Sequence, residues 1–217
     1  MAKTNLKLVP PTSELREVKV CKRSNEEMGR TREYLTKAEI ERLVEAAKGK
    51  TEREKKYALR NSTMILVGYR HGLRVSELTD LQWSDVDFKA STLHIRRAKG
   101  GNTGSHPIRG DELRALRALQ AQQIKAGRQC AWIFPTQRDT AFTTAAFASL
   151  ISKAGERAKL PFKVHPHMLR HTMGYVGINS GWGLREVQDY LGHKSINSTT
   201  RYARLAHERF KNLTEKL

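Results

Sequence analysis

Two short stretches of the sequence combine arginine with glutamate or histidine. In residues 72–78 (GLRVSEL), Arg74 follows a glycine at which the chain can turn sharply after a helix. In residues 165–171 (HPHMLRH), His167 and Arg170 are three positions apart, so they would share one face of a helix. An arginine guanidinium can donate paired hydrogen bonds to phosphate oxygens, and fixed positive donors stabilise charge that develops on a phosphate. The two stretches therefore indicate phosphate chemistry, with Arg74 and Arg170 as the candidate ligands.

Two further stretches add a possible proton donor and a possible nucleophile. Lys99 precedes a glycine-rich turn, and a lysine on such a hairpin can protonate a leaving oxygen if nearby positive charge lowers its pKa. The sequence YLGH at residues 190–193 predicts a helix that ends at a glycine and leaves His193 at its exposed end. A short helix over residues 196–204 would then present Tyr202.

Each of these residues also has an ordinary structural explanation. Arg74 can be a surface arginine paired with Glu77, Lys99 can be a solvated lysine, and Tyr202 can be one packing residue among six tyrosines. The histidines of residues 165–171 can be satisfied within the fold. A metal site formed by those histidines is disfavoured, because no cysteine or acidic ligand lies near and the adjacent arginine repels a cation. We therefore expect neither a metal nor a cofactor.

The elements that must position these residues are expected to be mainly helical. Thr36 is a good N-cap with Glu39 three residues later as its capping-box partner, and apolar residues then recur at helical spacing. Short strand-like runs occur only between residues 86 and 108, so the prediction is a mainly α-helical fold with a small three-stranded antiparallel sheet. The predicted helices cover about residues 36–47, 54–71, 75–81, 111–125, 143–158 and 196–204, with another that begins near Pro166, and the predicted strands cover 86–88, 92–97 and 106–108.

Composition limits the class of partner. The 217 residues contain 40 Lys+Arg against 22 Asp+Glu, a formal net charge of +18. Such a charge attracts polyanions, most commonly DNA, although an unspecialised basic protein would share it. No apolar run approaches the roughly 18 residues of a membrane helix, and the N-terminal residues lack a secretory signal. We therefore expect double-stranded DNA as the partner, no membrane, and a cytoplasmic, nucleoid-associated location.

Taken together and in this order, the four stretches resemble the tyrosine recombinase (phage integrase) family. The order is G-L-R-x-S-E-L, a hairpin lysine, H-x-x-R, L-G-H and a tyrosine, and it extends over about residues 36–205. Arg170 lies 32 residues and His193 lies nine residues before Tyr202, and both spacings are similar to those of the family. One motif alone is weak, but several in the right order are specific. Residues 165–193 especially resemble the short recombinases that invert fimbrial promoter segments.

The resemblance implies a site-specific recombinase that cleaves and rejoins DNA through a 3′-phosphotyrosine, without metal or ATP. It implies that Arg74 and Arg170 clamp the scissile phosphate while Tyr202 attacks it. The remaining implied roles are proton transfer from the tyrosine for His167, a hydrogen bond to a non-bridging oxygen for His193, protonation of the leaving 5′ oxygen for Lys99, and support of Arg74 or His167 for Glu77.

The resemblance also divides the chain. Residues 36–217 would be the catalytic domain, and residues 1–35 would be a basic, partly ordered arm. Most members of the family carry a further N-terminal DNA-binding domain, which we do not find here, so we expect the catalytic domain, the arm or an accessory DNA-binding protein to hold the DNA. Residues 206–217 form an amphipathic tail that in the family docks on a neighbouring subunit. A homotetramer on paired DNA sites is therefore expected, and a tail folded on its own chain is the alternative.

Three other functions compete with this prediction. A type IB topoisomerase shares the chemistry but relaxes supercoils as a monomer, and the L-G-H step and the tail favour recombination over it. A non-catalytic DNA-binding relative is disfavoured by the full set of candidate active-site residues. A metal-dependent nuclease would need a carboxylate cluster that we do not find. Inversion, integration, excision and dimer resolution stay open at this point.

Overall fold

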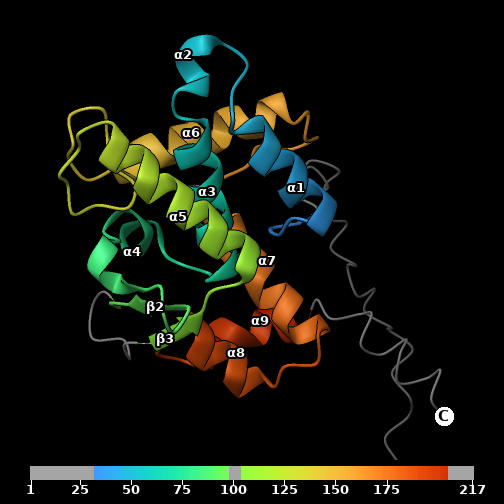
Figure 1. Ribbon diagram of the computed structural model, residues 1–217. Helices are drawn as coiled ribbons and strands as arrows, with labels where there is room; N and C mark the ends of the chain where they lie inside the picture. Colours follow the sequence, from blue (N-terminus) through green and yellow to red (C-terminus); the bar gives the residue numbers. More distant parts are fainter. Residues whose placement is uncertain (1–31, 98–103, 205–217) are drawn as a thin grey trace, which may run out of the picture. The chain divides into compact units, whose positions relative to one another are not determined.

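The computed structural model describes residues 32–97 and 104–204, which Figure 1 shows as a ribbon. Residues 1–31, most of the predicted arm, lie outside the described residues, and so do Lys99 and the predicted tail. The described elements are α1 (Lys37–Ala46), α2 (Glu52–Lys55), α3 (Ala58–Arg70), α4 (Val75–Thr79), η2 (Trp83–Asp85), β1 (Val86–Asp87), β2 (Thr92–Ile95), β3 (Gly104–Pro107), α5 (Gly110–Lys125), α6 (Thr144–Arg157), α7 (Pro166–Asn179), α8 (Leu184–Leu191) and α9 (Asn197–Arg204).

The three strands form one antiparallel sheet in the order β1-β2-β3. Leu93 of β2 pairs with His106 of β3. Leu93 and Ile95 are buried whereas His94 between them is exposed, so β2 turns one face to the core, as the alternation of side chains along a strand requires. The predicted fold class, mainly α-helical with a small three-stranded antiparallel sheet, is confirmed. Within the described part of the chain, no helix combines the length and the apolar character needed to cross a membrane.

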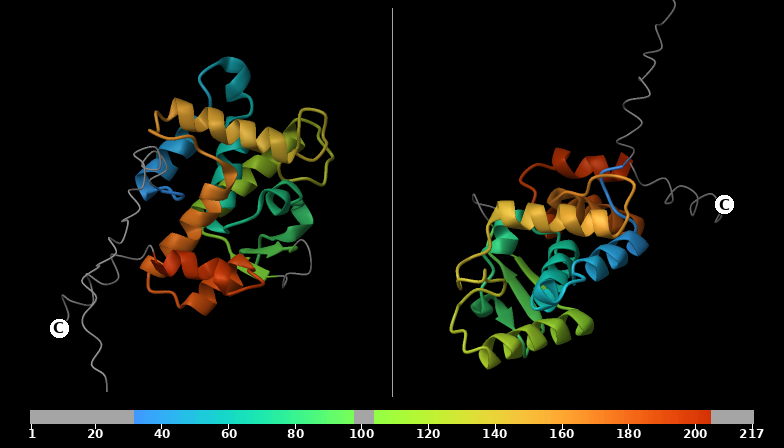
Figure 2. Two further views of the ribbon diagram at one scale, coloured as in Figure 1. Left: turned by 180° about the vertical axis from the view of Figure 1, so that it is seen from behind. Right: turned by 90° about the horizontal axis from the view of Figure 1, so that it is seen from above.

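Two hydrophobic clusters divide the core. The larger one joins α1, α3, α4, α5, α6, the sheet and the first half of α7. The smaller one is formed by Ile178 of α7, Val187 and Leu191 of α8, and Tyr202 of α9. Helix α7 belongs to both, because it packs against α3 in the larger cluster and against α8 and α9 in the smaller one. Figures 1 and 2 show α7 running from the larger group of helices to α8 and α9.

The backbone around the site is shaped by helix ends, and the sequence contains a signal for each of these ends. Gly72 after α3 and Gly192 after α8 have φ angles of +57° and +64°, which glycine adopts without the steric cost of a Cβ. Pro166 occupies the first turn of α7, and the capping box between Thr36 and Glu39 forms at the start of α1. These predicted ends are confirmed. The carbonyl oxygens of Gly72 and Gly192 both accept hydrogen bonds from arginines of the site.

The single helix predicted over residues 54–71 is wrong in its first part. The structure has two helices there, α2 and α3, separated at Tyr57, whose φ and ψ of −109° and 8° are not helical. Thr51 and Glu54 form a capping box that starts α2 earlier than predicted. The apolar residues on which the prediction relied begin at Leu59 and all lie in α3.

Candidate active site

Arg74 lies at the start of α4, where the chain turns after α3. It is the N-cap residue of this helix, and its Nη1 donates to Oε1 of Glu77 at 2.6 Å. Its Nη2 donates to the carbonyl oxygen of Gly192 at 3.1 Å. A surface arginine paired with Glu77 was the alternative to a phosphate-binding Arg74, and this pair is present. The arginine side chain nevertheless keeps 33% of its surface exposed. Arg74 is therefore both anchored and open to a ligand.

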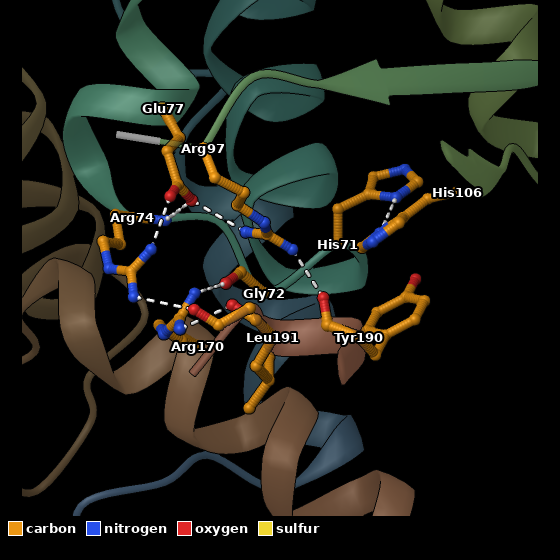
Figure 3. Close-up of polar contacts among 10 residues, drawn as sticks. His71, Gly72, Arg74, Glu77, Arg97, His106, Arg170, Tyr190 and Leu191 are labelled. Carbon is orange, nitrogen blue, oxygen red and sulfur yellow. Dashed lines mark hydrogen bonds and ion pairs between the residues drawn. The ribbon is translucent and has the colours of Figure 1, made fainter. Parts of the chain in front are cut away.

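Glu77 is a buried carboxylate between two arginines. Its Oε2 accepts a hydrogen bond from Nη1 of Arg97 at 2.9 Å, while Oε1 accepts from Arg74. Burial, the largest effect, would raise the pKa of Glu77, but the backbone N–H of Arg74 and the charges of Arg97 and Arg74 lower it. The carboxylate is therefore negative at neutral pH and fixes both guanidinium groups (Figure 3).

Arg97 follows β2 and reaches across to the end of α8. Its side chain is 1% exposed, and its Nη2 donates to the carbonyl oxygen of Tyr190 at 2.5 Å. A Cβ added at Gly192 would lie 2.7 Å from Nε of Arg97, so the glycine also leaves room for this arginine. The charge of Arg97 is therefore held inside the site and balanced by Glu77.

Arg170 of α7 joins the ends of two other helices. Its Nη1 donates to the carbonyl oxygen of Gly72 at 2.6 Å, and its Nη2 donates to that of Leu191 at 2.7 Å. Carbonyl groups at a helix end lack partners within their own helix, so the arginine satisfies them (Figure 3). Burial and the charge of Arg74 lower the pKa of Arg170 to about 10, which leaves it charged at neutral pH. We call Arg74, Glu77, Arg97 and Arg170 the arginine cluster.

Tyr202 lies on α9 and is 2% exposed. Its ring packs on Gly174 of α7, where an added Cβ would lie 2.5 Å from Cε2 of the tyrosine. Its hydroxyl forms a hydrogen bond with Nδ1 of His171 at 3.0 Å. Burial raises the pKa of Tyr202, although Arg170 and Arg201 oppose part of that rise, so the phenol is protonated at neutral pH.

Two histidines lie beside these groups. Nδ1 of His193 is 2.8 Å from Oγ1 of Thr199, and its ring is nearly parallel to that of Tyr202 with the centroids 6.2 Å apart. Burial, and then the charge of Arg170, lower the pKa of His193 to about 4, so this ring is neutral at pH 7. His167 is exposed near the start of α7, and partial burial and Arg170 lower its pKa as well.

The structure brings most of the predicted residues together and adds two. Arg74, Arg170, His193 and Tyr202 all meet where α3 ends, α8 ends and α7 passes between them. The sequence did not single out Arg97 or His171 for a role in the site. The signal for His171 was its position four residues after His167, on the same face of the helix, whereas nothing distinguished Arg97 from other arginines after a strand.

A second buried polar cluster lies on the other side of Tyr190 (Figure 3). Nε2 of His71 is 2.8 Å from Oε1 of Glu112, and its Nδ1 is 3.3 Å from Nδ1 of His106. The ring of His106 stacks on that of Tyr190 with a centroid distance of 3.9 Å. Neither here nor elsewhere in the described residues do three or more His, Cys, Asp or Glu side chains form a group that could hold a metal ion. This cluster joins α3, β3 and α5 to α8.

The sequence of this chain matches those of known proteins over most of its length. The profile of the Phage integrase family matches residues 33–209. The type 1 fimbriae regulatory protein FimB of Escherichia coli K12 is 34% identical over 193 residues, which cover 88% of this chain and 94% of FimB. The type 1 fimbriae regulatory protein FimE of the same strain is 36% identical over 188 residues, which cover 85% of this chain and 92% of FimE.

Solved structures share the fold. The crystal structure of XerA recombinase superposes with a TM-score of 0.72 at 28% identity, covering 84% of this chain and 64% of that chain. The XerH site-specific recombinase bound to its palindromic difH substrate gives a TM-score of 0.71 at 22% identity, covering 83% of this chain and 52% of that chain. The chain thus spans nearly all of FimB and FimE, but at most 64% of these two solved chains.

Proposed function

This chain belongs to the phage integrase family and is a site-specific tyrosine recombinase, and from that premise we propose that it cleaves and rejoins double-stranded DNA through Tyr202. The observation that carries the proposal is the seating of the Tyr202 ring on Gly174, in the same helix as Arg170. A tyrosine hydroxyl and a phosphate-binding guanidinium on adjoining helices are what transfer of a phosphate to tyrosine needs.

The arginine cluster would bind the scissile phosphate. Arg74 and Arg170 would stabilise the charge of the pentacoordinate transition state, since donors already fixed in place need no reorganisation during the reaction. Glu77 would position Arg74, because its carboxylate accepts hydrogen bonds from both the side chain and the backbone of that arginine. His193 is neutral, and its Nδ1 can accept a hydrogen bond from the Thr199 hydroxyl. Its Nε2–H is then free to donate to a non-bridging oxygen of the phosphate.

Tyr202 would attack the phosphorus atom. The oxygen–phosphorus bond forms as the bond to the 5′ oxygen breaks, and the product is a 3′-phosphotyrosine and a 5′ hydroxyl. Lys99 would protonate the leaving oxygen, and the family resemblance would make His167 the group that accepts the proton of the tyrosine hydroxyl. The covalent intermediate keeps the energy of the broken bond, so rejoining needs no ATP, and the arginines supply the charge stabilisation that a metal supplies in other enzymes.

The partner would be double-stranded DNA, and the active form an oligomer. The net charge of +18 and the likeness to a recombinase solved with its difH substrate support DNA binding. We extend the proposal to a homotetramer on two paired sites, in which residues 206–217 of each subunit dock on a neighbour. Residues 1–35 or an accessory DNA-binding protein would add DNA contacts, and the bacterial nucleoid would be the place of action.

The test is covalent trapping on nicked DNA. Nicked duplexes that carry the inverted repeats flanking the gene are incubated with the protein, and covalent complexes are separated in denaturing gels. Wild type should trap DNA, whereas Tyr202→Phe should bind the same duplex and trap none. Tyr175→Phe is the matched control, because Tyr175 lies on α7 and stacks on Tyr34, and it should trap as wild type does. Trapping by Tyr202→Phe, or trapping that EDTA abolishes, would contradict the proposal.

A further inference from the structure

We propose that His171 is a further catalytic residue, which accepts the proton of the Tyr202 hydroxyl as that oxygen attacks the scissile phosphate. The inference rests on the proposed function, since it concerns proton transfer in the same reaction. The family resemblance gives this role to His167, but the histidine that contacts the tyrosine hydroxyl in this structure is His171.

His171 and Tyr202 are in direct contact across neighbouring helices. Nδ1 of His171 lies 3.0 Å from the hydroxyl oxygen, and the ring centroids are 5.9 Å apart at an angle of 56°. This distance is within the reach that a general base needs. The histidine side chain is 16% exposed and the tyrosine is 2% exposed, so little water competes for the hydroxyl. Among the described residues, His171 is the hydrogen-bond partner of this hydroxyl.

A carboxylate lies on the opposite side of the imidazole. Oε2 of Glu33 is 3.7 Å from Nε2 of His171, and Nη1 of Arg201 is 3.9 Å from the same carboxylate oxygen. A carboxylate that faces Nε2 favours the tautomer with the proton on Nε2. The lone pair of Nδ1 is then directed at the tyrosine, which is the orientation that a proton acceptor requires. Glu33, His171 and Tyr202 thus form a carboxylate–imidazole–hydroxyl series.

The charge state of His171 also fits. Burial and then Arg201 lower the pKa of His171 to about 4, and Glu33 opposes part of this effect. His165 at the N-cap of α7 and His167 within the helix lower the pKa further. The ring is therefore neutral throughout the neutral range, so a nitrogen lone pair is available, although the imidazole is a weak base.

The step balances in protons and bonds. The O–H bond of Tyr202 breaks as its oxygen bonds to phosphorus, and the proton passes to Nδ1 of His171, which becomes an imidazolium. A phenol oxygen grows more acidic as it bonds to phosphorus, so a weak base suffices late in the step. Glu33 stabilises the imidazolium through its charge, and the proton returns to the tyrosine when the 5′ hydroxyl reverses the reaction.

His167 is placed for a different contact. It is exposed one helical turn before His171, with the two ring centroids 6.1 Å apart. Arg170, the arginine that would hold the phosphate, follows His167 by three positions on α7, and burial and then the charge of Arg170 lower the pKa of His167. The exposed ring is open to the phosphate of bound DNA, whereas the ring of His171 is turned to the buried hydroxyl.

The experiment compares His171→Gln with His167→Gln. Glutamine keeps a hydrogen bond to the tyrosine but cannot take its proton. The substrate is the nicked duplex that wild type cuts, with sulfur in place of the leaving 5′ oxygen, because a thiolate leaves without a proton donor. We measure the rate of covalent trapping and the DNA affinity from pH 7 to 9. Across this interval the neighbouring His193 and Arg170 keep their charge states, with pKa values of about 4 and about 10.

At pH 7, His171→Gln should lower the trapping rate by about 10²–10⁴-fold, the usual contribution of a general base, with unchanged DNA affinity. Its rate should then rise about tenfold per pH unit up to pH 9, because the reaction would depend on the ionised fraction of a tyrosine whose pKa burial raises above the ordinary phenol value. Wild type should be flat, and so should His167→Gln, whose reduced rate would reflect lost phosphate contact alone.

A second variant tests whether a loss of rate comes from misfolding or from the lost base. His171→Ala leaves a cavity beside the hydroxyl, and added imidazole should restore trapping in proportion to its concentration. A His171→Gln rate within a few-fold of wild type would overturn the inference, and so would a slow but pH-independent rate with no rescue by imidazole. A wild-type protein that traps nothing would instead contradict the proposed function itself.

Discussion

Each guanidinium of the arginine cluster donates to two fixed partners, whereas the hydroxyl of Tyr202 has one hydrogen-bond partner among the described residues, His171. The partners of the arginines are the Glu77 carboxylate and the backbone carbonyl oxygens of Gly72, Tyr190, Leu191 and Gly192. Gly72 follows α3 of the larger core, whereas Tyr190, Leu191 and Gly192 lie at the end of α8 in the smaller cluster, so the arginines join the two clusters. Tyr202 belongs to the smaller cluster alone.

The difference separates a preformed part of the site from an adjustable one. Phosphate-binding donors are most effective when they need no reorganisation, and a buried ion pair with backbone anchors meets that requirement. A nucleophile must instead approach the phosphorus closely as the new bond forms. A small cluster of helices opens at lower free energy than the main core, so we expect α9 to adjust while the arginine cluster stays fixed.

The largest expected effect comes from breaking the fixed part. Glu77→Gln removes the negative charge between Arg74 and Arg97, and Arg97 is then a buried cation without a counter-charge. We expect the free energy of unfolding to fall by about 3 kcal/mol, as when one partner of a buried pair is lost. Chemical denaturation measures this change. Glu45→Gln is the matched control, because its pair with Lys48 is exposed, and it should change stability by less than about 1 kcal/mol. Equal losses of unfolding free energy in the two variants would show that Glu77 is held no more firmly than an exposed ion pair.

A smaller effect should follow from moving the nucleophile alone. Gly174→Ala places a methyl carbon 2.5 Å from Cε2 of the buried Tyr202 ring, so the ring must be displaced. We expect the rate of covalent trapping to fall by at least about tenfold, since a displacement of roughly 1 Å can cost about 100-fold, with a smaller loss of stability than in Glu77→Gln. Gly110→Ala is the control, because its Cβ would meet Arg114 only at an ordinary 3.6 Å, and it should trap as wild type does. A stability loss as large as that of Glu77→Gln would show that the tyrosine is as rigidly held as the arginines.

The smallest effect should come from the contact between α9 and His193. Thr199 is fully buried, and Thr199→Val keeps its shape while removing the hydroxyl that meets Nδ1 of the histidine. We expect a loss of about 1 kcal/mol in unfolding free energy, typical of one hydrogen bond, and a smaller loss of trapping rate than in Gly174→Ala. Thr199→Ser keeps the hydroxyl and should retain the wild-type rate. A Thr199→Val rate below that of Gly174→Ala would place His193, rather than the tyrosine, as the most sensitive part of this region.

Helix ends and the family were predictable because their signals are local. Gly72, Pro166 and Gly192 each impose a backbone conformation on their own neighbours, so sequence alone locates the turns. The order and spacing of the motifs were likewise sufficient for the family. The break at Tyr57 was missed: the capping box between Thr51 and Glu54 starts a separate short helix, and the apolar residues from Leu59 onward belong to α3 alone.

Which groups touch one another depended on the tertiary structure. The sequence shows that Arg97 follows a strand and that His171 follows Arg170, but residues far apart in the chain supply the partners of both. Burial in the tertiary structure also determined the charge states of the site, since it made the phenol of Tyr202 harder to ionise and kept the imidazole of His171 neutral. Side-chain type and spacing determined the chemistry available to this protein. Long-range packing decided which histidine meets the tyrosine, because hydrogen bonds and desolvation act through space and not along the chain.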